Sequence, residues 1–189
     1  RSDTENWFVW HKSFPLPTVN GLYLDLTANV QNFGGTSFNS TLPSSSVITL
    51  GNANIVNGSG DNMLAYCFAP VNSYSAMGSY EGLGTAGGAF VYLGFRPALL
   101  IVKDVDGTWD WYMYDTARNT YNVVNNVLRP SGSNSEDSHG TNNTFDFLSN
   151  GFKVRGATSQ SEPTNYSGHT YIYYAVAENP FQANGGLAR

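Results

Sequence analysis

Apolar residues in this chain fall in short runs, alternating or continuous, and no segment has the spacing of a convincing amphipathic helix. Clusters of Gly, Asn, Ser and Pro separate the runs at intervals of about 8 to 15 residues, which is typical of an all-β chain. We therefore expect strands over 7–11, 22–26, 47–50, 63–69, 90–93, 98–103, 109–114, 152–155 and 171–177.

The order of these runs indicates an internal duplication. Residues 57–69 align with residues 165–177, with identities at an Asn, a Ser, a Gly, a Tyr and the final Ala. Two further pairs of blocks keep the same order along the chain: 7–10 with 111–114, and 47–51 with 152–156. Three blocks in a common order with similar spacing rarely arise by chance, so we interpret the chain as two half-repeats.

The duplication predicts an architecture. Half-repeat 1–77 and half-repeat 88–182 would each form a sheet of about four or five strands, followed by a short C-terminal tail at 183–189. One such sheet leaves an apolar face uncovered, and two packed face to face share a core. We expect a single antiparallel β-sandwich domain of jelly-roll or concanavalin-like type. Two small tandem β domains are the alternative.

The comparison of the halves also exposes a gap. The apolar block 90–103 precedes Trp111 in the second half-repeat, whereas only six residues precede Trp7 in the first. Three explanations are open: upstream polypeptide supplies the first strand, a neighbouring subunit supplies it, or the sheet has an open edge. An open edge favours pairing with another chain. The chain has no initiating Met and no signal peptide, which predicts a processed or fragmentary piece, and a cloning or proteolysis boundary explains the gap equally well.

Composition narrows the class of protein. The chain is 41% hydrophobic and 14% aromatic, enough for a real core, but only 12% charged. Neutral polar surfaces of this kind are common in extracellular β-proteins, fibres and lectins. A net charge of -5, with only Arg1 and Lys12 as basic residues in the first half, argues against a nucleic-acid or acidic-membrane partner. No apolar stretch approaches the roughly 18 to 20 residues of a membrane span.

Cysteine and histidine give no sign of chemistry. Cys67 is the only cysteine, which excludes an intrachain disulfide, and its apolar surroundings in 63–69 predict a buried structural thiol. His11, His139 and His169 lie in different segments without the spacing of metal ligands, so we expect scattered structural histidines and no metal site.

Two loops superficially resemble ligand-binding motifs. Asp104, Asp106 and Gly107 match the opening of a calcium loop, but Met113 stands where the final Glu is needed, so a β-turn between strands is the better interpretation. The glycine pattern of 82–87 precedes an expected strand and not a helix, which is the wrong context for dinucleotide binding.

Acidic and aromatic residues leave some alternatives open. Asp115 and Arg118 predict a structural ion pair or turn clamp ahead of ligand contacts. Trp109 and Trp111 would share one face of a regular strand, with Tyr112 and Tyr114 on the other; a core position is favoured over a sugar-stacking platform. Five carboxylates could in principle pair for glycoside hydrolysis, although nothing singles out a pair: Glu81, Asp110, Asp115, Glu162 and Glu178.

A series of motifs gives the chain a family resemblance. These are AYCFA at 65–69, GSYEG at 78–82, FVYLGFRPA at 90–98, YDTARN at 114–119, DFLSNGFK at 146–153 and AENPF at 177–181. The series resembles an uncharacterised β-sandwich domain family of tailed-bacteriophage virion proteins, labelled as tail-fibre or appendage proteins and often adjacent to concanavalin-A-like lectin domains. Members of that family usually continue upstream with a further strand.

The resemblance implies a location and a role. It places the chain in the virion, in a tail fibre or other surface appendage, where it assembles with itself as a homo-oligomer or with other virion proteins. It implies no catalytic residue and no cofactor, and the sequence singles out no ligand-binding residue. We therefore expect a structural or adhesion module and not an enzyme. A lectin-like module that recognises a host-surface glycan is the first alternative, and a polysaccharide-degrading glycosidase is the second.

Overall fold

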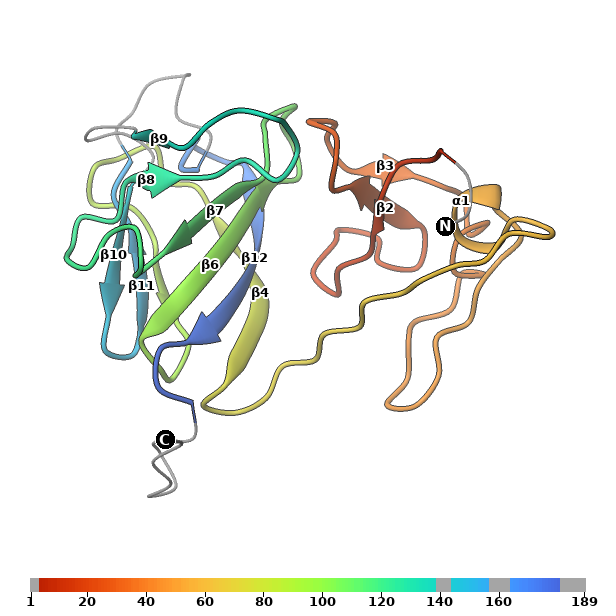
Figure 1. The fold of residues 1–189 in the computed structure, drawn as a ribbon, viewed down its shortest axis with the longest axis horizontal. Helices are drawn as coiled ribbons and strands as arrows, with labels where there is room; N and C mark the ends of the chain where they lie inside the picture. Colours follow the sequence, from red (N-terminus) through yellow and green to blue (C-terminus); the bar gives the residue numbers. More distant parts are fainter. Residues whose placement is uncertain (1–3, 139–143, 157–163, 181–189) are drawn as a thin grey trace.

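The computed structural model describes residues 4–138, 144–156 and 164–180. Within them almost all regular structure is antiparallel β-sheet, which confirms the all-β, sandwich-like class. The chain forms an N-terminal unit (residues 4–57), a connecting segment (residues 58–71) and a β-sandwich (residues 75–177), which Figure 1 shows in this order along the chain.

Two sheets make the sandwich. The larger has four strands in the order β4 (Ser75–Glu81), β12 (Thr170–Ala177), β6 (Pro97–Asp104) and β7 (Tyr112–Asp115). The smaller has three strands in the order β10 (Phe145–Leu148), β11 (Gly151–Val154) and β5 (Phe90–Tyr92). A two-stranded ribbon lies beside them, formed by β8 (Asn126–Val127) and β9 (Asp137–Ser138).

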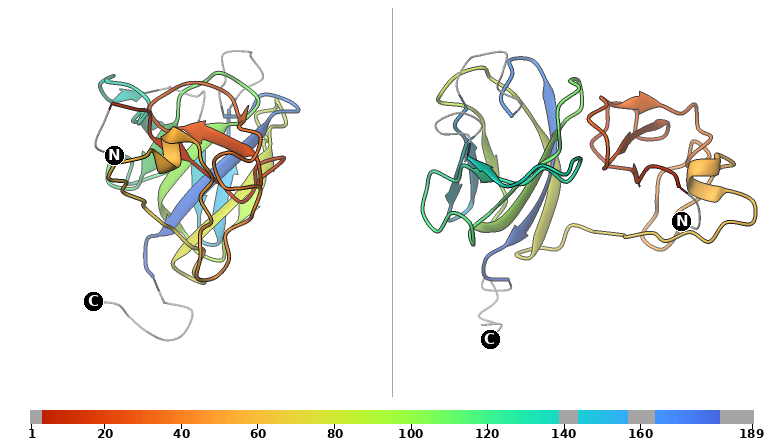
Figure 2. Two further views of the ribbon diagram at one scale, coloured as in Figure 1. Left: turned by 90° about the vertical axis from the view of Figure 1, so that its right-hand side faces the viewer. Right: turned by 45° about the horizontal axis from the view of Figure 1, so that its top comes forward.

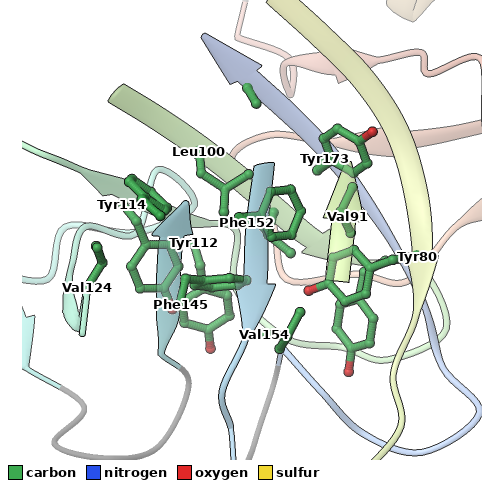
Figure 3. Close-up of a cluster of buried hydrophobic side chains, with 14 of the residues drawn as sticks. Tyr80, Val91, Leu100, Tyr112, Tyr114, Val124, Phe145, Phe152, Val154 and Tyr173 are labelled. Carbon is green, nitrogen blue, oxygen red and sulfur yellow. The ribbon is translucent and has the colours of Figure 1, made fainter. Parts of the chain in front are cut away.

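The main core lies between the two sheets (Figure 3). Side chains alternate along a strand, so every second residue of β12 faces inward, including Tyr171 and Tyr173. Phe145 and Phe152 of the smaller sheet are fully buried against them, with the rings of Phe152 and Tyr173 centred 5.4 Å apart. Apolar burial of this extent is the main stabilising contribution to the sandwich.

The N-terminal unit has little regular structure. A three-stranded sheet is formed by β1 (Phe8–Val9), β2 (Asn20–Tyr23) and β3 (Gln31–Asn32), in that order. A single helical turn, α1 (Asn54–Asn57), ends the unit. No helix in the described part of the chain combines the length and the apolar character needed to cross a bilayer.

A second apolar cluster attaches the N-terminal unit to the sandwich. Ile172 of β12 lies on the face of the sheet opposite the main core. Together with Trp111, just before β7, and Val105, just after β6, it packs against Phe14 and Leu22. The N-terminal unit therefore covers the outer face of this sheet, and Figure 2 shows it in front of the sandwich when viewed from that side. β12 contributes residues to both clusters, which makes it the central strand of the molecule.

The structure corrects the predicted division into half-repeats. Both sheets of the sandwich lie within residues 75–177, so they are not one sheet from each half-repeat. Of the three aligned pairs of blocks, only 7–10 and 111–114 contain strands in both halves. Segments 47–50 and 63–69 are not strands. The duplication itself stays a prediction.

Candidate functional site

The connecting segment is the most unusual surface of the protein. It leaves α1, crosses from the N-terminal unit to the sandwich as an extended chain, and enters β4 (Figure 1). Its apolar side chains point into solvent: Leu64 is 62% exposed, Tyr66 65% and Phe68 63%. Soluble proteins rarely expose a continuous apolar run, and such runs mark interaction surfaces.

Two aromatic contacts hold the connecting segment in place. The ring of Tyr66 stacks on that of Trp7, with centroids 6.1 Å apart and planes 22° from parallel. The ring of Phe68 packs against Tyr174 on the outer side of β12, at 5.2 Å. The segment is therefore fixed at one ring of the N-terminal unit and one ring of the sandwich, while most of its apolar surface stays uncovered.

The prediction that Cys67 is buried is wrong, because its thiol is exposed on this segment. The apolar run 63–69 has the composition of a core strand but lies on no sheet. Exposure depends on where the N-terminal unit lies, and nothing in the run itself distinguishes a buried strand from an exposed one.

A second candidate lies in the loops at one end of the sandwich. Asp104 is fully buried, and one of its carboxylate oxygens is 2.8 Å from Nδ1 of His169. Its other oxygen accepts hydrogen bonds from the backbone N–H groups of Asp106 and Gly107, both at 2.9 Å. The expected turn between β6 and β7 is thus confirmed, since Asp104 closes it in the way Asp residues close turns.

Lys103, next to this turn, is also fully buried. Its Nζ donates hydrogen bonds to the carbonyl oxygens of Asp104 (2.7 Å), Gly107 (3.2 Å) and Thr27 (3.5 Å). Burial lowers the pKa of Lys103 to about 8, while the carboxylates of Asp104 and Asp110 act in the opposite direction. All of these partners are structural groups of the chain, so the cluster stabilises the turn and the contact with the N-terminal unit.

The described histidines serve separate structural roles. His11 belongs to the N-terminal unit and bonds to a backbone carbonyl of β12, whereas His169, just before β12, bonds to Asp104. His139 lies outside the described residues. Among the residues that the structure describes, no three His, Cys, Asp or Glu side chains group as metal ligands.

The candidate carboxylates in the described part of the chain have separate partners or surroundings. Glu178 forms an ion pair with Arg96 at 2.8 Å. Asp110 accepts a hydrogen bond from Ser131 at 2.8 Å. Glu81 lies exposed at the end of β4, and Glu162 lies outside the described residues.

Asp115 and Arg118 form the predicted turn clamp. Their side chains make an ion pair, and Asp115 accepts a hydrogen bond from the backbone N–H of Arg118 at 2.9 Å. The aromatic prediction needs a correction, because β7 begins after Trp109 and Trp111. Trp109 packs against the main core, Trp111 against the second cluster, and so they do not share a face.

A shallow depression of about 490 Å³ lies in the N-terminal unit. Glycines, small polar residues and one leucine line it: Gly34, Gly35, Thr36, Asn39, Ser40, Leu50, Gly51 and Asn52. No carboxylate, histidine, lysine or cysteine is among them, and the only hydroxyl groups are those of Thr36 and Ser40. The loop 82–87 leads into β5 and not into a helix, as its sequence context predicted.

Comparison with known proteins gives one result. No curated protein and no solved structure matches the chain significantly. Residues 1–180 match the family described as a domain of unknown function, DUF7483. Since this match spans nearly the whole chain, the protein belongs to the DUF7483 family.

Proposed function

We propose that this chain is a non-catalytic structural module of a tailed-bacteriophage virion, in a tail fibre or another surface appendage. In this role it assembles with copies of itself or with other virion proteins. The sequence motifs that resemble phage virion proteins are one support for the proposal. The observation that carries it is the connecting segment, whose apolar side chains lie on the surface of the isolated chain.

The exposed apolar surface extends beyond the connecting segment. Most of the large apolar side chains that are exposed belong to residues 7–74: Trp7, Leu16, Leu26, Leu42, Val47, Ile48, Leu50, Met63, Leu64, Tyr66, Phe68, Val71 and Tyr74. Few charges accompany them, because the chain is only 12% charged. A surface that is both apolar and weakly charged favours association with other protein surfaces over solvation as a monomer.

Location in the particle tests the proposal. Antibodies against the full chain are applied to purified particles of the phage that encodes it, and immunogold microscopy locates the label. We expect label on tail fibres or another appendage, and the chain among the proteins of washed particles by mass spectrometry. Absence of the chain from washed particles, together with its presence in the lysate, would contradict the proposal.

A lectin-like role is the second candidate, supported by the exposed aromatic pair. Trp7 is 52% exposed and stacks on Tyr66, and exposed aromatic rings are the surfaces on which sugar rings stack. A glycan array with the full chain tests this role. A signal that Trp7→Ala abolishes and Tyr121→Ala leaves intact would support it, because Tyr121 is an exposed aromatic residue outside the pair. Absence of binding to any host polysaccharide on the array would contradict the lectin-like role.

The non-catalytic part of the proposal has its own test. The candidate carboxylates Glu178, Asp115 and Asp110 are each engaged by a separate arginine or hydroxyl group. Incubation of the chain with host polysaccharide should leave the polymer length unchanged. Shortening that a single carboxylate-to-amide substitution abolishes would show that the chain is an enzyme.

A further inference from the structure

The connecting segment is a strand without a ladder. No hydrogen bond of the described residues involves the backbone of residues 63–68, although this stretch is extended and apolar. Backbone N–H and C=O groups in an extended apolar run form a ready template for pairing with another strand. A strand edge that is itself free is the kind of partner with which such a segment can pair.

β4 has such an edge. It is the outermost strand of the four-stranded sheet and pairs with β12 on one side only. The N–H of Gly82 donates to the carbonyl oxygen of His169 at 2.8 Å. The backbone N–H and C=O groups of the even-numbered residues in this stretch therefore point to β12. Alternate residues of an antiparallel strand bond to opposite sides. Ser75, Met77 and Ser79 therefore direct their backbone groups to the outer edge.

The start of this edge is already occupied by a turn. Val71 and Ser75 exchange two backbone hydrogen bonds, at 3.0 and 2.9 Å, around a reversal in which Ser73 has a φ of 60°. Upstream of this turn, from Ala69 back to the N-terminal unit, the chain runs away from the edge of β4. Beyond this first bridge, the edge of β4 has no partner among the described residues.

The sequence of the segment indicates which edge it fits. Residues 57–69 align with residues 165–177, which contain β12, the established neighbour of β4. In that alignment Cys67 corresponds to Ala175, whose partner in β4 is Ala76. On the outer edge, the same register would keep the side-chain pairs that β12 makes with β4, while the backbone bonds would go to the odd-numbered residues of β4.

We propose that residues 62–67 of one copy of the chain pair antiparallel with the free edge of β4 in a second copy, in the register that β12 uses. This inference rests on the proposed role in assembly and names the surfaces involved. Leu64 and Tyr66 direct their N–H and C=O groups to Ser79 and Met77 of the other copy. Reciprocal exchange gives a closed two-fold dimer in which each four-stranded sheet gains a fifth strand.

Pairing within one chain would have a different register. Extending the Val71–Ser75 bridge along the same strand places Cys67 opposite Ser79. It also draws the segment away from the contacts of Tyr66 with Trp7 and of Phe68 with Tyr174. Pairing with a second copy places Cys67 opposite Ala76. The two arrangements therefore predict different cross-links.

The single native cysteine makes the test direct. The full chain is prepared as Ala76→Cys and as Ser79→Cys, oxidised under mild conditions, and analysed by non-reducing gel electrophoresis. For Ala76→Cys we expect a disulfide-linked dimer well above the level of the parent chain, in which only Cys67 can cross-link. Peptide mapping should show that Cys67 is bonded to the cysteine introduced at position 76.

The Ser79→Cys variant is the matched control and should stay at the parent level of dimer. Two outcomes would overturn the proposal. One is a bond within a monomer between Cys67 and the cysteine introduced at position 79. The other is a level of dimer in Ala76→Cys that does not exceed that of the parent chain.

Proline substitutions give a second readout that does not depend on cysteine. Leu64→Pro removes an N–H that the proposed ladder uses, whereas Ala65→Pro removes one that points away from it. We expect the dimer dissociation constant, from sedimentation equilibrium, to rise at least about tenfold in Leu64→Pro and to change less than about twofold in Ala65→Pro. Circular dichroism checks that both variants fold. Equal changes of the dissociation constant in the two variants, or a parent chain that is monomeric at all concentrations, would reject this pairing. Whether the chain belongs to the particle is decided separately by the immunogold labelling.

Discussion

The Nε2 atom of His11 lies 3.3 Å from the carbonyl oxygen of Tyr173, and this hydrogen bond ties the N-terminal unit to the central strand of the sandwich. A carbonyl oxygen only accepts, so Nε2 carries the proton. The other ring nitrogen, Nδ1, accepts from the backbone N–H of Ser13 at 3.1 Å. Both neighbours therefore hold His11 in one neutral tautomer.

Acid should weaken the fold through His11. Burial lowers the pKa of His11 from 6.5 to about 4, the bond to Tyr173 acts in the opposite direction, and the charge of Lys12 lowers it further. The unfolded chain then binds a proton between pH 6.5 and 4 that the folded chain excludes, so stability is lost as the pH falls through this window. We expect a loss of about 2 kcal/mol between pH 7 and pH 5 from this group, measured by urea unfolding. His11→Gln should remove that part of the pH dependence, and an unchanged pH dependence in this variant would contradict the assignment.

Lys103 predicts a second window, on the alkaline side. Because its pKa is lowered to about 8 in the folded state, the unfolded chain holds more protons between pH 8 and 10.5. Stability should therefore rise by about 2 kcal/mol from pH 8 to pH 10 in unfolding titrations. Lys103→Met should lack this rise. Above pH 10 the trend should reverse, since burial raises the pKa of Tyr112 and Tyr171 and keeps both protonated in the fold.

Removal of the Phe152 side chain should strongly destabilise the main core. It is fully buried, and its ring lies 5.9 Å from that of Tyr80 and 5.7 Å from that of Phe145. We expect Phe152→Ala to lower the free energy of unfolding by about 3 to 5 kcal/mol. Phe90→Ala is the matched control, because Phe90 is 49% exposed on the same sheet, and it should cost less than about 1 kcal/mol. Similar losses in the two variants would mean that this core is not where the structure places it.

Trp111 should control the docking of the N-terminal unit. Its Nε1 donates to the carbonyl oxygen of Tyr23 at 2.8 Å, and its ring packs in the second apolar cluster. Trp111→Phe leaves that carbonyl without its donor, at a cost of about 1 to 3 kcal/mol. Hydrogen exchange at the N–H of Val30 reports the docking, because this group bonds to Val105 of the sandwich at 2.8 Å.

The control for this measurement is Trp10→Phe. It loses an equivalent bond, from Nε1 to the carbonyl oxygen of Pro17 at 2.8 Å, within the N-terminal unit itself. We expect exchange at Val30 to accelerate more in Trp111→Phe than in Trp10→Phe. Equal acceleration would indicate that the two parts are not joined through Trp111.

The strands that could be predicted from the sequence are those whose own apolar pattern indicates burial. β6 and β12 are long apolar runs with inward-facing Leu100, Val102 and Tyr171, and the expected bounds of both lie close to the observed ones. β4 escapes prediction because Ser75–Glu81 consists mainly of small and polar residues and is held by β12 on one side. β10 escapes it because Asp146 interrupts its aromatic pattern, and only the structure supplies Arg155 as its ion-pair partner.

The candidate surface is harder to predict than the fold. The turn clamp of Asp115 and Arg118 follows from their spacing, because such an interaction is local. The exposure of Cys67 does not, because it depends on the position of the N-terminal unit on Trp111 and Ile172, far along the chain. The apolar composition of a run therefore does not show whether the folded chain covers it.

The extended course of the connecting segment has a mechanical consequence. A chain that is already drawn out has little length left to give, since a residue spans at most about 3.3 to 3.6 Å. A pull on the N-terminal unit would first load its docking contacts around Ile172 and Trp111. Once these separate, tension passes through Val71 into β4, the edge strand of the sheet. A further strand on that edge would resist peeling, so the same contact that joins two copies would also reinforce each of them against force.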